Sequence, residues 1–299
     1  MPYRGMSNWM KPTTRFRELV ERDEILPAMG GYDALSANLI EQAGGEVVYM
    51  SGSSVSTTTH AYPDVGVTTM TEMVTRARQM VNAVDIPVFC DADTGYGNPI
   101  NVVRTVEEYE SAGVAGIHIE DQSFPKKCGH FDEKSVIPTK EMVQKIRAAT
   151  DAREDEDFLI VARTDARAVN GFDDAVDRCD QYLDAGADVL FFEAPTSESE
   201  LRRVAEEFGD DVPLLANMTE GGETPLFTAQ EFEEFGYDIV LYPATGFKAA
   251  QKALRDVYNE IAETGTQKGV MDKLVTWQER NDLNGLDEVI ALEQKYASD

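Results

Sequence analysis

Five consecutive residues place a thiol among cationic side chains. Cys128 follows Lys126 and Lys127 and precedes Gly129 and His130. Neighbouring positive charge favours the thiolate and brings the pKa of a cysteine toward the range useful for proton transfer. Gly129 leaves space beside the sulfur and permits a tight turn. We therefore interpret Cys128 as a functional residue rather than as an incidental thiol in a solvated loop. Read from these residues alone, it could transfer a proton, act as a nucleophile, bind a metal or sense the redox state.

Four carboxylates form a candidate metal site. Asp91 and Asp93 share one short segment, Asp64 precedes them, and Glu120 follows. Carboxylates that lie close together repel one another unless a cation neutralises them. Mg²⁺ prefers oxygen ligands and keeps several waters, so we expect only one or two of these groups to bind it directly. We predict Mg²⁺ here, with Mn²⁺ as an alternative.

Two other metals fit the residues less well. Ca²⁺ also binds oxygen, but the carboxylates lack the spacing of an EF-hand. Zn²⁺ held by Cys128 and His130 would need a second pair of ligands, and the sequence offers none at a matching spacing. Both remain alternatives to Mg²⁺ at this stage.

Anion-binding groups accompany the carboxylates. Arg163 carries a planar fork that suits a carboxylate, and the segment Ser51, Gly52 and Ser53 can present main-chain N–H groups. These groups indicate a substrate that carries carboxylates.

Eight short apolar segments are expected to form the strands that position these residues. Each is followed by a stretch with helical periodicity, and their unbroken apolar character is typical of parallel strands buried on both faces. The segments are residues 25–28, 47–50, 87–90, 116–119, 158–161, 189–192, 212–215 and 238–241. The helical patterns cover 32–42, 71–84, 103–112, 140–150, 172–185, 197–208, 228–235 and 247–264.

This alternation predicts an α/β fold, a (β/α)8 barrel over residues 1–265. A doubly wound sheet is the alternative, but no phosphate-binding fingerprint follows the first strand. Functional side chains of such barrels lie at the carboxyl ends of the strands. The candidate polar residues follow the apolar segments at the expected points: Ser51, Asp91, Glu120, Arg163, Glu193 and Asn217.

Residues 266–299 are predicted to be a helical extension. Two amphipathic patterns there have apolar faces that must be buried against the barrel or against a neighbouring subunit.

The chain is strongly acidic. It has 27 Lys and Arg against 55 Asp and Glu, which gives a net charge of −28. This charge repels nucleic acid and anionic membranes, so we exclude both as partners. The acidic residues are spread along the chain, as in a protein from a high-salt, halophilic cytoplasm. A carboxylate substrate would therefore need local positive charge at its site.

Cysteine usage indicates a reducing compartment. The three cysteines are widely spaced, which argues against a disulfide framework. No apolar run reaches membrane-spanning length, and the first residues lack the apolar segment of a signal peptide. We expect a cytoplasmic protein.

Short motifs in a fixed order run through most of the chain. They are Tyr49–Gly52, Pro63–Gly66, Asp91–Gly97, His118–Gln122, Lys126–His130, Ala162–Ala166, Phe192–Ala194, Leu215–Glu220, Thr224–Phe227, Leu241–Pro243 and Gly265–Lys268. This combination resembles the isocitrate lyase and phosphoenolpyruvate phosphonomutase superfamily, and within it the 2-methylisocitrate lyase branch. The Lys-Lys-Cys-Gly-His motif resembles the carbon–carbon lyases rather than the phosphonate enzymes.

The resemblance implies a Mg²⁺-dependent retro-aldol cleavage of a 2-hydroxy tricarboxylate. Asp91 would contact the metal, and Asp64, Asp93 and Glu120 would act largely through water. The metal would act as a Lewis acid toward the substrate hydroxyl and carboxylate.

Catalytic roles also follow from the resemblance. Cys128 would protonate the carbanion-like succinate enolate, with Lys126 and His130 adjusting the sulfur. Tyr49 and Glu193 are the candidates that would take the hydroxyl proton. The implied substrate-binding residues are Ser51, Gly52, Ser53, Asp64, Lys127, Gly129, Arg163, Glu193, Asn217 and Thr219.

The implied substrate is 2-methylisocitrate, which gives succinate and pyruvate. Phe191, Leu241 and Pro243 match the small apolar pocket that receives the extra methyl group in that branch. Isocitrate, which gives glyoxylate, is the alternative, because one methyl group changes discrimination by only about 1–3 kcal/mol. Phosphonomutase or oxaloacetate hydrolase chemistry, or a non-catalytic carboxylate-binding paralogue, fits the motifs less well. The resemblance also implies a helix exchanged between subunits of a homo-oligomer, usually a tetramer.

Overall fold

The computed structural model describes residues 10–127, 129 and 134–297. The described chain divides into two compact units, which meet at residues 247 and 248 within one long helix. The unit up to residue 247 contains all of the strands.

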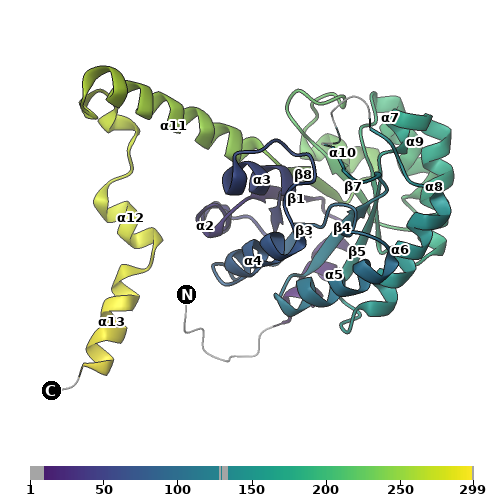
Figure 1. The fold of residues 1–299 in the computed structure, drawn as a ribbon, viewed down its shortest axis with the longest axis horizontal. Coiled ribbons are helices and arrows are strands. Elements are labelled where there is room, and N and C mark those ends of the chain that lie inside the picture. The colour runs from purple at the N-terminus through teal and green to yellow at the C-terminus, as the bar shows by residue number, and fades with distance from the viewer. Residues whose placement is uncertain (1–9, 128, 130–133, 298–299) are drawn as a thin grey trace. The chain divides into compact units, whose positions relative to one another are not determined.

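Eight parallel strands close into a barrel in chain order, and Figure 1 shows them inside a ring of helices. Leu26 on the first strand lies opposite Ile239 on the last, which closes the sheet. The strands are β1(Leu26–Gly31), β2(Val48–Met50), β3(Val88–Asp91), β4(Gly116–Glu120), β5(Leu159–Thr164), β6(Val189–Phe192), β7(Leu214–Asn217) and β8(Ile239–Tyr242). The predicted barrel is confirmed, and each strand overlaps the apolar segment expected for it.

The helices match the predicted periodic stretches, with three additions. Those expected are α2(Ala34–Gln42), α4(Met70–Val81), α5(Pro99–Ser111), α6(Thr139–Ala152), α8(Phe172–Asp184), α9(Glu198–Phe208), α10(Ala229–Phe235) and α11(Thr245–Thr264). The additions are α1(Pro12–Val20), α3(Gly52–His60) and α7(Ala166–Asn170). Helix α3 lacks a clear helical signal because Ser, Thr and Val dominate it, and these residues have low helix propensity.

Side chains on alternate positions of each strand fill two separate apolar layers. On β5, Leu159 and Val161 point into the barrel, whereas Ile160 and Ala162 pack under the surrounding helices. Phe16 of α1 joins the inner layer, where its ring lies 5.4 Å from that of Phe89. Each fully buried Leu, Val or Phe contributes about 1.5–3 kcal/mol, so the barrel is a rigid frame for groups at the strand ends.

The second unit contains most of α11, a 3₁₀ helix at Lys268–Lys273, α12(Trp277–Leu283) and α13(Leu286–Tyr296). Trp277 and Val275 are 73% and 72% exposed. In the described part of the chain, none of the helices has the length and apolar character needed to cross a membrane.

Candidate active site

The carboxyl ends of neighbouring strands bring the predicted polar residues together. Asp91 ends β3, and it pairs in register with His118 on β4. Glu120 ends β4 and pairs with Arg163 on β5. Because parallel strands present their carboxyl ends at one rim of a barrel, residues distant in the sequence become neighbours.

Asp91, His118 and Glu120 form a buried cluster that suits a metal. Ligand atoms of the three lie within 4.8 Å of one another. Burial raises the pKa of Glu120 well above its ordinary value and lowers that of His118 to about 4, so the imidazole is neutral at pH 7.

Two atoms of this cluster lack a hydrogen-bond partner among the described residues. They are Oε1 of Glu120 and Nδ1 of His118, and both side chains are at most 1% exposed. A buried acceptor left unpaired is costly, and a cation would satisfy it. Carboxylate oxygens with a neutral imidazole are ligands of divalent cations. The residues present therefore fit a divalent metal.

The other two predicted metal-site carboxylates contact an ammonium group. Lys126 Nζ lies 2.6 Å from Oδ1 of Asp64 and 2.6 Å from Oδ1 of Asp93. Burial, together with the charges of Asp91 and Asp64, raises the pKa of Asp93 to about 7 even though Lys126 opposes this shift. Burial acts to lower the pKa of Lys126, but the charges of Asp93 and Asp64 outweigh it and raise the pKa well above its ordinary value.

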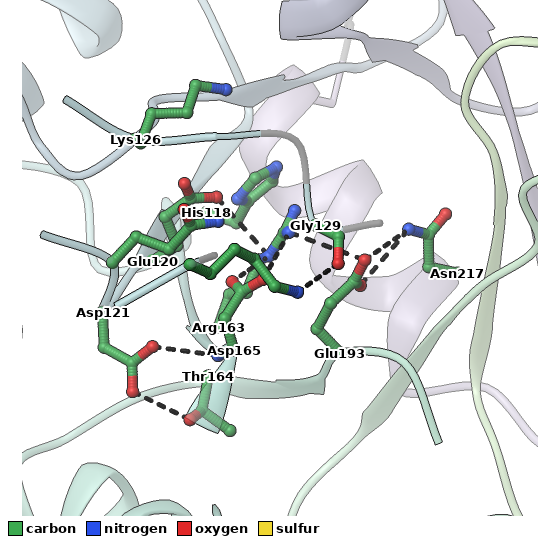
Figure 2. A network of polar contacts seen from close by, with 12 residues as sticks. His118, Glu120, Asp121, Lys126, Gly129, Arg163, Thr164, Asp165, Glu193 and Asn217 are labelled. Carbon is green, nitrogen blue, oxygen red and sulfur yellow. Dashed lines mark hydrogen bonds and ion pairs between the residues drawn. The ribbon is translucent and has the colours of Figure 1, made fainter. Parts of the chain in front are cut away.

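Arg163 lies at the centre of a ring of carboxylates, as Figure 2 shows. Its Nε and Nη2 donate to the two oxygens of Asp165 at 2.9 and 3.1 Å. Glu120 lies 3.4 Å from Nε, and Glu193 lies 3.5 Å from Nη2. The guanidinium also lies 4.9 Å from the ring centre of Phe191. A planar fork held on several sides has little freedom to change its orientation.

The main chain at Gly129 passes close to this arginine. A Cβ at that position would lie 2.4 Å from both Arg163 Nη2 and Glu193 Oε1. Lys134 Nζ donates to the Gly129 carbonyl and lies 3.3 Å from Oδ1 of Asp165, so one ammonium ties the segment to the strand end. Only glycine fits here without displacing charged groups. The predicted catalytic residues Cys128 and His130 lie outside the described residues.

Tyr49 completes the inner wall of the site. Its hydroxyl lies 2.9 Å from Nε2 of His118, and burial raises its pKa well above the ordinary value, so it stays protonated. At the adjacent strand end, a Cβ on Gly52 would lie 2.5 Å from Oδ2 of Asp91. The first turn of α3 therefore approaches the Asp91 carboxylate closely.

The remaining predicted binding residues line the same strand ends or support them. Asn217 donates to both oxygens of Glu193 at 3.2 Å, and Thr219 donates to Asn217 at 3.1 Å. Ser51 Oγ lies 3.3 Å from Ser53 Oγ.

Three further residues predicted to bind substrate are Lys127, Leu241 and Pro243, and each has different contacts in the structure. The main chain of Lys127 is bonded through both N–H and C=O to the Gln122 side chain at 2.9 Å. Leu241 belongs to the apolar layer inside the barrel together with Phe191. Pro243 follows β8, and its carbonyl crowds the Cβ position of Gly30. Leu241 therefore belongs to the inner apolar layer and lies level with Asn217, near the carboxyl end of its strand.

Sequence reasoning missed several residues that support the site: His118, Asp165, Lys134 and Asp121. His118 could have been found as a polar side chain inside an apolar strand, and Asp165 because it lies two residues after Arg163 on the same face. Asp121 accepts hydrogen bonds from Thr164 Oγ1 at 2.8 Å and from the Asp165 N–H at 2.9 Å. Figure 2 shows both contacts.

Two residues of α8 contact Asp121 from the other side. Arg178 Nη1 and the Tyr182 hydroxyl donate to it at 3.0 and 2.8 Å. No motif in the sequence pointed to this pair, because the two residues read as ordinary members of an amphipathic helix.

Comparison with known proteins agrees with the fold. Residues 16–262 match the phosphoenolpyruvate phosphomutase family. The chain is 46% identical over 291 residues to 2,3-dimethylmalate lyase of Eubacterium barkeri, covering 97% of this chain and 99% of that protein. It is 49% identical over 275 residues to 2-methylisocitrate lyase of Aeropyrum pernix, covering 92% of this chain and 88% of that protein.

A solved structure of a related enzyme has the same fold. The crystal structure of a 2,3-dimethylmalate lyase matches with a TM-score of 0.91 and 36% identity over 97% of each chain. The sequence-based prediction of an enzyme that acts on carbon–carbon bonds is confirmed. The chain belongs to the phosphoenolpyruvate mutase and isocitrate lyase superfamily, and it is a carbon–carbon lyase of that group.

Proposed function

We propose that this protein cleaves 2-methylisocitrate into succinate and pyruvate with the help of Mg²⁺ or Mn²⁺. The observation that supports this most strongly is the placement of Arg163 beside the Asp91, His118 and Glu120 cluster at one rim of the barrel. A cationic fork next to a metal-fitting cluster suits a substrate with a hydroxyl group between carboxylates.

Asp91 and Glu120 would hold the metal, and His118 would stand beside them with a neutral ring. When bound, the metal supplies Lewis acidity toward the hydroxyl and the carboxylate of the carbon that becomes the 2-oxo acid. The side chains of the protein would hold the substrate next to this metal site in one orientation.

Substrate carboxylates would bind to donors on the same rim. Among the described residues, the ion pairs of Arg163 to acidic side chains run through Nε and Nη2. We propose that Nη1 donates to a substrate carboxylate. The main-chain N–H groups at the start of α3 would receive a second carboxylate, since a helix N-terminus favours negative charge. Asn217 fixes Glu193 within this set.

Two proton movements complete the reaction. Glu193 would take the hydroxyl proton, because Tyr49 is held protonated by burial and serves better as a donor. The C–O bond then becomes the carbonyl of pyruvate. The electron pair of the breaking C–C bond stays on the carbon that becomes part of succinate. Cys128 would deliver a proton to that carbon, which yields succinate.

A second candidate substrate is 2,3-dimethylmalate. The similarity to a 2,3-dimethylmalate lyase extends over nearly the full length of both chains. Both substrates release pyruvate from the same hydroxyl-bearing half, and they differ in whether a third carboxylate is present. Isocitrate remains a third candidate, because it lacks only a methyl group.

A substitution of the thiol tests the proposed chemistry. Cys128→Ser should lower kcat by about 10²- to 10⁴-fold, the usual contribution of a general acid, and should leave KM nearly unchanged. Cys179→Ala is the matched control, because Cys179 is a buried free thiol on α8. Full activity of Cys128→Ser would overturn the assigned role.

The proposal extends to assembly and location. The exposed apolar side chains of the second unit, Trp277 and Val275 among them, would be buried by a neighbouring subunit in a homo-oligomer, with a tetramer as the expected state. The cysteine content favours a reducing, cytoplasmic location.

A further inference from the structure

The ammonium group of Lys126 has an unusual position for a lysine next to a metal-fitting cluster. Its side chain is 3% exposed, and Nζ lies 2.6 Å from one oxygen of Asp64 and 2.6 Å from one oxygen of Asp93. Lysine is almost never fully buried unless it is paired. Here one ammonium lies between two carboxylates and forms an ion pair with each.

Asp93 connects this ammonium to the metal-fitting cluster. Its main-chain N–H donates to Oδ1 of Asp91 at 2.8 Å, and its carbonyl accepts from the N–H of Glu120 at 2.9 Å. Asp93 also adopts a left-handed backbone with φ of 48°, which is uncommon for a residue other than glycine. Such a conformation persists only where the surroundings hold it in place. The position of its carboxylate is therefore closely coupled to Asp91 and Glu120.

A divalent metal at Asp91 and Glu120 would bring a hydration shell with it. Mg²⁺ keeps several waters, and those waters donate hydrogen bonds to nearby carboxylates. Asp64 and Asp93 are carboxylates that could accept these hydrogen bonds. Lys126, however, already forms an ion pair with one oxygen of each. The ammonium also repels a divalent cation directly.

We propose that Lys126 is a built-in competitor of the metal: its ammonium group bridges Asp64 and Asp93 and weakens the affinity of the site for a divalent cation. Lys126 holds the carboxylates together when the metal is absent and yields them to metal-bound water when the metal enters. The inference rests on the proposed function only in taking a divalent metal as the ligand of Asp91 and Glu120.

Direct metal binding tests the competition without substrate. Mg²⁺, and in parallel Mn²⁺, is titrated into metal-stripped full-length protein by isothermal titration calorimetry. Lys126→Met should bind either ion at least about tenfold more tightly than the wild type, because one unit of positive charge next to the site is removed. Lys126→Gln, which keeps an amide donor to the carboxylates without the charge, should shift affinity in the same direction. It also provides a second neutral variant if the methionine variant folds poorly.

Two control variants isolate the bridging position. Lys126→Arg keeps the charge and should bind the metal about as weakly as the wild type. Lys145→Met removes another buried ammonium, one that donates to the Thr94 carbonyl at 3.0 Å rather than bridging two carboxylates. Its effect on metal affinity should be clearly smaller than that of Lys126→Met.

Thermal melts give an independent readout. Without metal, Lys126→Met should melt below the wild type, because the buried Asp93 and the partly buried Asp64 lose their partner. Saturating Mg²⁺ should raise its melting temperature by more than it raises that of the wild type, since ligand stabilisation grows with affinity.

Equal or weaker Mg²⁺ binding by both neutral variants would overturn the competition while leaving the metal-dependent function intact. If neither ion binds the wild type or the neutral variants, both the competition and the metal requirement of the proposed function are wrong. If the ions bind as predicted but no 2-oxo acid is released from the candidate substrates, the proposed function alone fails.

Discussion

At the scale of single residues, the site depends on close approaches that only particular side chains permit. Gly129 and Gly52 each leave room where a Cβ would meet a charged group at 2.4 or 2.5 Å. Arg163 fills the remaining space with a rigid fork. A lysine at position 163 could not reproduce this pair of parallel hydrogen bonds.

Gly129→Ala tests the importance of this close approach. The new methyl group should displace the side chains of Arg163 and Glu193, and a misplacement of about 1 Å can cost about 10²-fold in rate. We expect kcat/KM to fall about 100-fold.

Gly246→Ala provides the control, because a Cβ there would lie no closer than 3.9 Å to its nearest neighbour. Steady-state kinetics and thermal melts of both variants decide the outcome. Unchanged kinetics in Gly129→Ala would show that the main chain does not approach Arg163 during turnover.

The sequence predicts acidic and basic site residues better than their partners. Asp91, Glu120 and Arg163 stand out because charged groups directly follow apolar segments. His118 is recognisable only as a polar side chain inside an apolar strand, and Lys134 does not stand out at all. Nothing in the chain order tells which residues will contact either of them. Lys126 was expected to adjust the sulfur of Cys128, whereas the structure pairs its ammonium with Asp64 and Asp93. Such pairings depend on geometry across several strands.

At the scale of elements, a helix behind the barrel wall supports the catalytic rim. Asp121, between β4 and β5, links Arg178 and Tyr182 of α8 to the main chain of Asp165. Asp165 in turn holds Arg163 through two hydrogen bonds. A continuous set of buried polar contacts therefore runs from α8 to Arg163, the arginine proposed to bind substrate.

Tyr182→Phe should weaken this support without removing it. Loss of one hydrogen bond to a buried carboxylate costs about 1.5–3 kcal/mol of stability. We also expect KM to rise by about tenfold with a smaller change in kcat, because Arg163, which we propose binds substrate carboxylates, would lose its fixed orientation.

Tyr237→Phe is the matched control, because Tyr237 is also buried and its hydroxyl donates to a neutral group, the Leu201 carbonyl, at 3.4 Å. Kinetics measured well below both melting temperatures separate the two roles. If Tyr182→Phe loses stability but keeps its KM, the cluster supports the fold alone.

The strands were predictable and some helices were not, for a physical reason. Strands buried on both faces have continuous apolar sequences, and all eight were identified. Helix α3 was not among the predicted helices, because its Ser and Thr residues hide helical periodicity. Because Ser51 to Ser53 lie at the N-terminus of this helix, the proposed binding of an anion there has a physical basis.

At the scale of the whole molecule, the excess of acidic residues is the main electrostatic influence on stability. A net charge of −28 produces self-repulsion that opposes the compact state. Salt reduces it, because the screening length falls from about 10 Å at 0.1 M to about 3 Å at 1 M. Salt should screen the charges of the site less than those of the surface, since Arg163 and Lys126 are buried next to their partners.

Stability should therefore rise with salt. Between about 0.1 and 1 M KCl we expect the melting temperature to increase, by about 2–4 °C for each 1 kcal/mol of repulsion removed. Differential scanning calorimetry measures this, and sucrose, which does not screen charge, serves as the comparison solute. A melting temperature that is flat or falls with KCl would contradict the expectation of a halophilic protein.

The central claim is metal-dependent cleavage of a carbon–carbon bond with release of a 2-oxo acid. The most direct test is a parallel steady-state assay of 2-methylisocitrate, 2,3-dimethylmalate and isocitrate, with Mg²⁺ and after chelation, at high KCl. We predict the highest kcat/KM for 2-methylisocitrate, stoichiometric pyruvate and succinate, and loss of turnover on chelation. Absence of a 2-oxo acid from all three substrates, or turnover that persists without metal, would contradict the account.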